Sequence, residues 1–168
     1  NGENVGKDEF LQKNFRGVVL ESFRKKLRTG LDVVNYPQHY DGMRQVSDVI
    51  HEAMDKGTFV VDEKAAFLPE VRLIGEEAKG LCEEFGKPIL LRVSLFGPME
   101  LYLKEIGVAL YTDVLDGFVE TVRRFAKNSI LNTKYIKTEV VSLDEPSFGF
   151  LNIAAEKDVL CGVLEKAF

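Results

Sequence analysis

The sequence predicts an α/β protein built around a parallel sheet. Amphipathic segments of helical length alternate with short apolar segments along the chain, and this alternation is typical of βαβ units. The chain has 168 residues, 45% of them hydrophobic, so it is long enough for one ordinary globular domain. About four strands are expected, whereas a closed TIM barrel has eight strands in about 250 residues. The chain is therefore either a small open sheet or part of a larger barrel.

The expected elements follow from hydrophobic spacing and from the residues that end helices and strands. Helices are expected at residues 10–27, 43–54, 75–85 (with a start as early as Pro69), 99–131 (broken near Gly107) and 154–167. Strands are expected at residues 31–34, 58–61, 89–94 and 136–143, the second of these on the weakest pattern. Gly30 follows the basic last turn of the first helix, and Pro37 closes the first strand because proline cannot continue a central ladder.

Composition and charge exclude several classes of partner. The net charge is −5, and the strongest basic run, Arg24–Arg28, is expected to be a solvated helix end, so no nucleic acid is expected. No apolar run approaches the roughly 20 residues that span a bilayer, so no membrane is expected. The cysteines, Cys82 and Cys161, lie far apart, which argues against a disulfide framework and favours a cytoplasmic location. Cys161 is expected to be a small core residue of the last helix.

Three expected strand ends carry unusual residues, and ligands of parallel α/β proteins bind beyond such ends. These ends are Asn35–Asp41, Ser94–Pro98 and Ser142–Ser147. The third contains Asp144 and Glu145, two adjacent carboxylates whose burial requires a partner cation or several hydrogen bonds. A carboxylate in this position binds a substrate ammonium group or acts as an acid or base. The alternative is that it caps a turn.

The other two strand ends give simpler signals. Gly97 lets a ligand approach the backbone and Pro98 fixes the turn, although the pair is also typical of a plain turn. His39 is placed to act as a ligand or a proton carrier, although an isolated loop histidine is usually a surface residue. His51 falls inside an expected helix with no metal-ligand partner, so we interpret it as structural.

Three short segments resemble the cobalamin-independent methionine synthases, most closely their short archaeal type. Gly30–Val34, followed by Gln38 and Met43, resembles the family's Gly-x-Asp strand with its Gly-Gln (or Gly-Glu) and Asp-Met pairs. Gly97-Pro98 resembles the family's Thr-Gly-Pro turn, and Val141–Pro146 resembles its Gln-Ile-Asp-Glu-Pro signature. The order and approximate spacing agree over most of the chain, and Asp-Glu-Pro is the most specific element. The wider superfamily includes uroporphyrinogen decarboxylase and corrinoid methyltransferases.

The resemblance implies a TIM-barrel enzyme of methionine biosynthesis that transfers a methyl group to the thiol of homocysteine, with zinc holding the sulfur as a nucleophilic thiolate. The family's aspartate of Asp-Glu-Pro binds the amino-acid ammonium group and corresponds to Asp144, and its early Gln or Glu corresponds to Gln38. The candidate substrate-binding residues are Asp144, Gln38, Glu145 and His39, beside a turn at Gly97 and Pro98. The expected partners are a homocysteine-like thiol and a methyl donor.

The chain departs from the family pattern in ways that point to half of a barrel. Pro37 and Gly42 stand where the family has glycine and aspartate. The family's zinc ligands, which begin with a His-x-Cys pair, follow its Asp-Glu-Pro signature. In this chain Cys161 is the only cysteine or histidine after that signature. We therefore expect residues 1–168 to form a single partial domain of parallel βα units, about half of a TIM-type barrel, that lacks the C-terminal zinc-site half. No cofactor is expected within this chain, although zinc is expected for the complete family site.

Two explanations of a half-barrel stay open, a fragment of a longer chain or a natural half-barrel. Both leave an exposed sheet edge, so we expect a homo-oligomer or a second half-barrel chain. The leading functional hypothesis is a methionine-synthase-like methyltransferase, inactive as this chain alone if the zinc half is missing. The alternatives are a corrinoid-linked methyltransferase or uroporphyrinogen decarboxylase-like enzyme, and a non-catalytic binding or assembly subunit.

Overall fold

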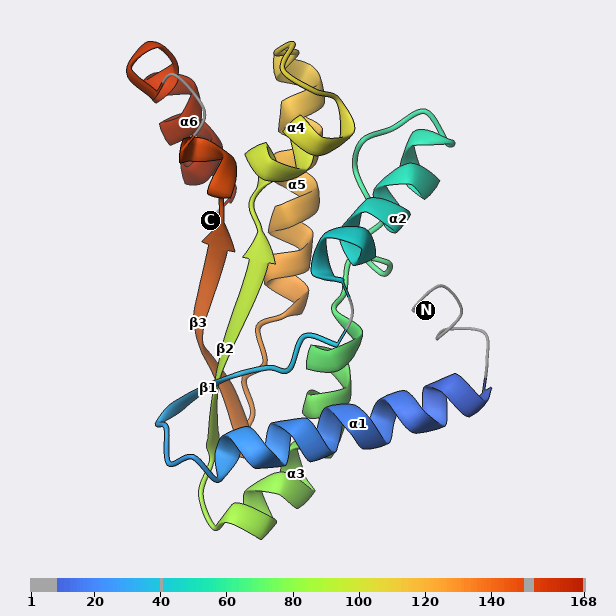
Figure 1. Ribbon diagram of the computed structural model, residues 1–168, viewed down its shortest axis with the longest axis vertical. Coiled ribbons are helices and arrows are strands. Elements are labelled where there is room, and N and C mark those ends of the chain that lie inside the picture. Colours follow the sequence, from blue (N-terminus) through green and yellow to red (C-terminus); the bar gives the residue numbers. More distant parts are fainter. Residues whose placement is uncertain (1–8, 40, 150–152, 168) are drawn as a thin grey trace. The chain divides into compact units, whose positions relative to one another are not determined.

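The computed structural model describes residues 9–39, 41–149 and 153–167 and has a mixed α/β architecture (Figure 1). Its helices are α1 (Glu9–Leu27), α2 (Gly42–Met54), α3 (Pro69–Phe85), α4 (Pro98–Glu105), α5 (Thr112–Asn128) and α6 (Ile153–Ala167), with a short 3-10 turn, η2 (Pro146–Gly149). Its strands are β1 (Val33–Asn35), β2 (Ile89–Phe96) and β3 (Ile136–Asp144). Within the described residues they form one parallel three-stranded sheet in the order β1-β2-β3. The α/β class expected from the sequence is confirmed.

The chain divides into two compact units. The first comprises Asn1–Asp41, Leu68–Val93 and Ser129–Val141, and the second comprises Gly42–Phe67, Ser94–Asn128 and Ser142–Phe168. The chain passes between the units several times, so β2 and β3 each begin in the first unit and end in the second.

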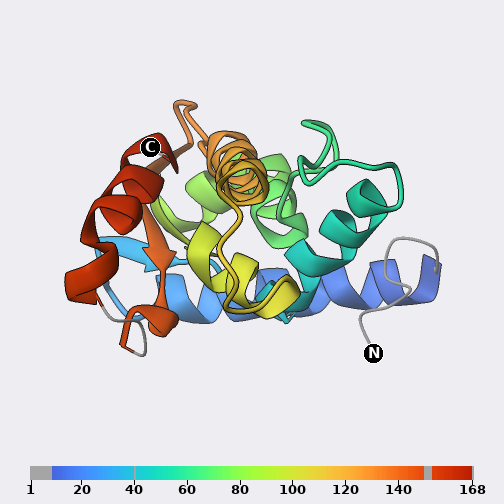
Figure 2. The same ribbon diagram turned by 90° about the horizontal axis from the view of Figure 1, so that it is seen from above.

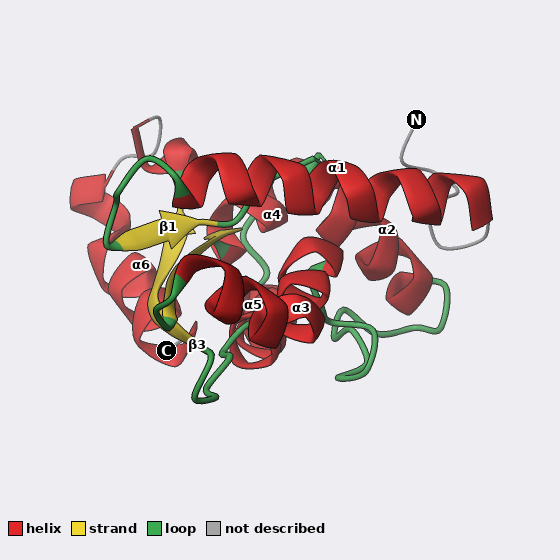
Figure 3. Cartoon of the chain, turned by 90° about the horizontal axis from the view of Figure 1, so that it is seen from below, coloured by secondary structure: helices red, strands yellow, loops and turns green. Residues whose placement is uncertain are grey.

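The first unit holds the pairing of β1 with β2 together with α1 and α3. Gly30, with a φ of 81°, lies between α1 and β1, where an L side chain would be strained. β1 then runs parallel to β2, with Asn35 opposite Arg92. α1 and α3 lie side by side (Figure 3), and Arg24 Nε donates a hydrogen bond to Glu84 Oε2 at 2.7 Å.

α5 is the centre of the helical cluster in the second unit. It packs against both α4 and α6 (Figure 2). Phe118 is fully buried, and its ring meets that of Tyr102 edge-on with centroids 5.7 Å apart. Burial of each such large apolar side chain contributes about 1.5–3 kcal/mol. The packing of Phe118 against Tyr102 therefore holds α4 against α5.

The Glu105 carboxylate fastens α2 to α4 within the second unit. Ser47 Oγ donates a hydrogen bond to Glu105 Oε1 at 2.6 Å, and His51 Nε2 lies 2.5 Å from Glu105 Oε2. Burial opposes ionisation of this carboxyl group, but the contacts with Ser47 and His51 outweigh burial and hold the pKa of Glu105 below its ordinary value. These contacts agree with the interpretation of His51 as a structural residue.

β2 alternates between covered and open positions. Leu91, Val93 and Leu95 are buried, whereas Arg92 is exposed. Because successive side chains of a strand point to opposite faces, one face of β2 is covered and the other is open at Arg92.

The strand expected at Thr58–Val61 is wrong. This segment is a loop, and side chains of α5 bind its backbone in place of a neighbouring strand. Thr121 Oγ1 donates to Phe59 O and accepts from Val61 N, both at 3.0 Å. Arg124 Nη1 donates to Val61 O at 2.8 Å. The β-branched residues give the segment a strand-like pattern, but tertiary contacts decide where its backbone hydrogen bonds go.

Two further expectations need correction. Cys161 is exposed, so it is not a small core residue. α6 buries Val163 and Ala167 instead, and a residue two positions before Val163 points to a nearly opposite side of a helix. The first strand begins at Val33, two residues later than expected, and Leu31 is 59% exposed.

In the described part of the chain, no helix combines the length and the apolar character that a bilayer crossing requires.

Gly117→Ala should destabilise the protein, because a Cβ at this position of α5 would lie 2.7 Å from Phe59 Cβ. We expect the free energy of unfolding to fall by about 1–3 kcal/mol, as is typical of overpacking. Gly80→Ala in α3 is the matched control, because no atom lies within 4 Å of the added Cβ. Alanine there should stabilise the helix by about 0.5–1 kcal/mol. Urea denaturation measures both changes, and equal stabilities of the two variants would show that α5 and the Phe59 loop do not touch.

Candidate functional site

The ends of β2 and β3 meet in the second unit. β2 ends at Phe96, and Gly97-Pro98 leads directly into α4. β3 ends at Asp144, and Glu145 leads into η2. Gly97 N donates a hydrogen bond to Asp144 O at 2.9 Å, so main chain joins the two strand exits. Pro98 begins α4. The first residue of a helix has no intrahelical partner for its N–H, so the lack of an N–H in proline costs no hydrogen bond there.

The Glu145 carboxylate caps the N-terminus of α4. Its Oε1 accepts a hydrogen bond from Met99 N at 3.0 Å, and its Oε2 accepts one from Glu100 N at 2.7 Å. Gly97, the residue before the helix, makes no side-chain cap, so Glu145 satisfies these amides from the neighbouring loop. A Cβ on Gly97 would overlap the Glu145 carboxyl group, so the close approach requires glycine.

Glu100 makes the reciprocal contact from the first turn of α4. Its Oε2 accepts a hydrogen bond from Ser147 N at 3.0 Å and another from the Ser147 hydroxyl. Glu145 therefore binds the backbone of α4, while Glu100 of α4 binds the backbone of η2. We call Gly97, Glu100, Glu145 and Ser147 the strand-end clasp.

Glu145 titrates at an unusual pH for a glutamate. Burial raises the pKa of Glu145 from 4.5 to about 7. The amides of Met99 and Glu100 favour the ionised form and the nearby Glu100 charge disfavours it, but burial has the largest effect. A carboxyl group that changes charge near neutral pH at a strand end is typical of functional sites and suits acid–base chemistry.

The Asp144 carboxylate is open to a ligand. Asp144 is exposed, and among the described residues none forms a hydrogen bond or an ion pair with its side chain. Its main chain, in contrast, is held by Gly97 N. Because its backbone is already fixed, binding a cation at Asp144 requires little ordering of the chain.

Gln38 and His39 belong to the first unit, where they follow β1. Gln38 Nε2 donates a hydrogen bond to Tyr36 Oη at 3.1 Å. His39 Nε2 lies 3.0 Å from Ser22 Oγ on α1, and His39 N donates to Glu70 Oε1 at 3.2 Å. Glu70 is buried at the start of α3, so this loop is tied to both helices of its unit.

The structure brings the site residues expected from the sequence together in two groups. Asp144, Glu145, Gly97 and Pro98 meet in the second unit, and Gln38 and His39 are neighbours in the first. The run Asn35–Asp41 also contains Tyr40, which lies outside the described residues.

Sequence reasoning missed the contributions of Glu100 and Ser147. An acidic residue two positions after a helix-starting proline is a recognisable signal, because it complements the helix dipole. Nothing in the sequence links it to a serine 47 positions away, so the clasp appears only in the fold.

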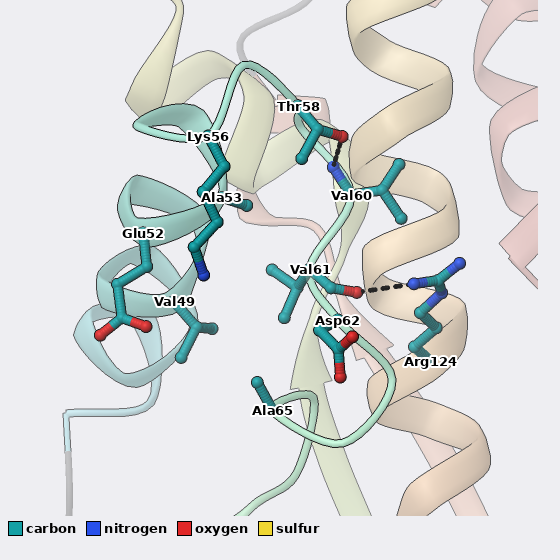
Figure 4. Close-up of a pocket in the computed structure, with 10 residues that line it drawn as sticks. All are labelled: Val49, Glu52, Ala53, Lys56, Thr58, Val60, Val61, Asp62, Ala65 and Arg124. Carbon is teal, nitrogen blue, oxygen red and sulfur yellow. Dashed lines mark hydrogen bonds between the residues drawn. The ribbon is translucent and has the colours of Figure 1, made fainter.

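A pocket of about 370 Å³ in the second unit lies between α2 and the loop that precedes α3 (Figure 4). Val49 and Val61 contribute to its apolar wall, and Lys56 and Asp62 bring opposite charges to its lining. Arg124 approaches the loop from α5 and binds Val61 O. None of the site residues expected from the sequence lines this pocket.

The described residues do not fit the zinc site that the resemblance implies. Within residues 9–39, 41–149 and 153–167, no group of three or more histidine, cysteine, aspartate or glutamate side chains is arranged to hold a metal ion.

Comparison of the chain with protein-family models, with curated proteins and with solved structures gives no match.

Glu145→Gln should remove a pH dependence from the stability of the protein. Since the folded state raises the pKa of Glu145 to about 7, it binds the proton more tightly than the unfolded chain does. The stability contributed by the neutral carboxyl group is therefore fully present below 4.5 and is lost as the pH rises through about 7. Glutamine has a similar shape and cannot ionise, so the free energy of unfolding of Glu145→Gln should change less over this range.

Chemical denaturation of wild type and Glu145→Gln at a series of pH values measures this difference. Glu165→Gln, at an exposed position on α6, is the matched control and should keep the wild-type pH dependence. Parallel stability curves for wild type and Glu145→Gln would show that Glu145 is not held as described.

Proposed function

We propose that this chain is a methionine-synthase-like methyltransferase module in which Asp144 binds the ammonium group of a homocysteine-type acceptor. The observation that carries the proposal is the open Asp144 carboxylate at the carboxyl end of a parallel strand, where ligands of such sheets bind. The methyl donor is the second substrate. In the complete family site zinc would hold the sulfur of the acceptor as a nucleophilic thiolate, and this chain contributes the part that binds the ammonium group of the acceptor.

The strand-end clasp gives Asp144 its support. Gly97 N holds the Asp144 carbonyl, and the next residue, Glu145, is bound at both carboxyl oxygens by amides of α4. Both sides of the Asp144 peptide are thus fixed before a ligand arrives. We therefore assign Glu145 to positioning and Asp144 to contact with the acceptor.

The proposed contact is weak when it acts alone. An exposed carboxylate–ammonium pair contributes about 0.2–1 kcal/mol, whereas millimolar binding corresponds to about 4 kcal/mol. Asp144 therefore sets the place of the ammonium group, and further contacts must hold the carboxylate and the sulfur of the acceptor. Gln38, which the resemblance also implicates in acceptor binding, and His39 stay predictions.

We further propose that the sheet is about half of a TIM-type barrel, completed by a second copy or a second half-barrel chain. Parallel sheets almost always have both faces covered. Here Arg92 of β2 is exposed, and Val140 of β3 is 41% exposed. β3 also ends the strand order of the described sheet and spans nine residues, which makes it a long edge for pairing.

A non-catalytic binding or assembly subunit is the second candidate, and the exposed Val140 favours it equally well. The two candidates differ in the acceptor, since only the first requires homocysteine at Asp144.

Asp144→Asn should weaken the binding of L-homocysteine, because it removes the charge with little change of shape. We expect the affinity to fall by up to about fivefold, the equivalent of a single exposed ion pair. Titration followed by backbone amide NMR measures such weak binding. The desamino analogue of homocysteine should bind wild type and Asp144→Asn equally. Asp158→Asn, an exposed position on α6, is the matched control. Equal affinities of wild type and Asp144→Asn for homocysteine would remove Asp144 from the acceptor site.

Light scattering after size exclusion should report a dimer or a larger assembly, because the edge strand of an open sheet presents unpaired N–H and C=O groups that pair with another chain. A monomer at every concentration tested would count against both the half-barrel and the assembly subunit.

A further inference from the structure

The pocket of about 370 Å³ between α2 and the loop before α3 takes no part in the proposed function. Its lining comes from α2, from the segment between residues 56 and 65, and from Arg124 of α5, all within the second unit. No residue of β1, β2 or β3 lines it, so it is separate from the sheet that a second half-barrel chain is proposed to complete. Its volume lies in the range of about 300–1,000 Å³ that is typical of small-molecule sites.

Side chains of α5 hold the loop wall of the pocket in place. Thr121 Oγ1 accepts a hydrogen bond from Val61 N, and Arg124 Nη1 donates one to Val61 O. Further along the loop, Asn128 Nδ2 donates to Glu63 O at 2.6 Å. The three side chains of α5 follow one another at intervals of three and four residues, so they lie on one face of the helix. The wall is therefore fixed before a ligand arrives, and binding requires little ordering of the chain.

The base of the pocket is apolar. Val49 and Ala53 come from α2, and Val61 and Ala65 come from the loop (Figure 4). Ala53 is 6% exposed and Val61 is 1% exposed, so both already belong to the core of the unit. A small aliphatic group that enters between α2 and the loop would be removed from water on both sides.

Three charged side chains line the pocket without pairing with one another. Glu52 and Lys56 stand on the α2 side, and Asp62 stands on the loop side (Figure 4). Among the described residues, neither a hydrogen bond nor an ion pair involves the Lys56 ammonium group, although both carboxylates line the same pocket. Glu52 and Lys56 are four residues apart, a spacing that commonly forms an ion pair on a helix. The positive charge on one side of the pocket and the negative charge on the other thus lack partners.

The Asp62 carboxylate is oriented by its own loop. Its Oδ1 accepts a hydrogen bond from Lys64 N at 2.9 Å, and its backbone carbonyl accepts hydrogen bonds from the amides of Ala65 and Ala66, both at 3.0 Å. This short turn fixes one oxygen of the carboxylate and leaves the other for a ligand. Asp62 and Lys56 therefore offer an acceptor and a donor from opposite walls of one pocket.

We propose that this pocket binds a small zwitterion with an apolar side chain, an aliphatic α-amino acid. Lys56 contacts the carboxylate of the amino acid, Asp62 contacts its ammonium group, and Val49 and Val61 receive its side chain. A simple amine would leave Lys56 without a partner, and a simple acid would lie beside carboxylates, so only a zwitterion matches both signs of charge. The Arg124 guanidinium, which already binds Glu120 and Val61 O, stays part of the wall.

Three molecules with the same branched chain test the proposal: L-leucine, 4-methylpentanoate, which lacks the ammonium group, and 3-methylbutylamine, which lacks the carboxylate. Titration of the full chain, followed by NMR of the Val49 and Val61 methyl groups, measures binding at this pocket. Leucine should bind about two- to fivefold more tightly than either analogue, because each analogue loses one exposed ion pair.

Two variants separate the two charges. Lys56→Met should lower the affinity for leucine and for 4-methylpentanoate about two- to fivefold, with no loss for 3-methylbutylamine. Asp62→Asn keeps an oxygen that accepts from the loop amide, and it should weaken leucine and 3-methylbutylamine by a similar factor, with no loss for 4-methylpentanoate. Lys64→Met and Asp55→Asn are the matched controls, because both positions are exposed and neither lines the pocket.

Asp144→Asn keeps this site distinct from the acceptor site of the proposed function. It should leave the leucine-induced shifts of Val49 and Val61 unchanged, whether or not homocysteine binding at Asp144 is lost. The proposal is overturned if leucine moves neither valine, if the three molecules bind alike, or if Lys56→Met binds leucine as Lys64→Met does. It is also overturned if Asp144→Asn abolishes the shifts, because the amino acid would then occupy the Asp144 site.

Discussion

The carboxylates of Glu145 and Glu100 hold the ends of β2 and β3 together, because each accepts hydrogen bonds from the backbone of the segment that carries the other. Glu145, after β3, accepts the first amides of α4, and Glu100, in α4, accepts the amide and hydroxyl of Ser147. This exchange requires glycine at position 97, because any larger residue would occupy the space of the Glu145 carboxyl group. It also leaves Asp144 as the carboxylate that a ligand can reach. The chemistry proposed for this chain depends on these different roles of two adjacent residues, Glu145 in positioning and Asp144 in contact with the ligand.

Glu145, a partly buried carboxyl group beside a helix N-terminus, experiences opposing effects. The α4 amides favour its charged form, whereas burial and the Glu100 charge favour its neutral form, and the balance raises the pKa of Glu145 to about 7. The hydrogen bonds from the α4 amides therefore favour the ionised carboxyl group, whereas the folded state as a whole loses stability relative to the unfolded chain as the pH rises through about 7.

Local signals in the sequence were sufficient for most of the fold. Hydrophobic spacing, a proline at the start of α3 and α4 and glycines near helix ends located the helices, and three of the four expected strands are present among the described residues. Thr58–Val61 was misassigned because Thr121 and Arg124 of a distant helix bind its backbone. Asp144 and Glu145 were recognised as a strand end, but their different roles were not. That difference arises from contacts between residues 45 and 46 positions apart, which no local pattern encodes.

The central claim is that Glu145 supports the site while Asp144 contacts the acceptor. Carboxyl ¹³C NMR of the full chain tests both parts, because it follows each side chain separately. The Glu145 signal should titrate near pH 7. L-homocysteine, added at constant pH, should shift the Asp144 signal and leave the Glu145 signal almost unchanged. An Asp144 signal that does not respond to homocysteine, or a Glu145 signal that titrates at the ordinary value of 4.5, would contradict the central claim.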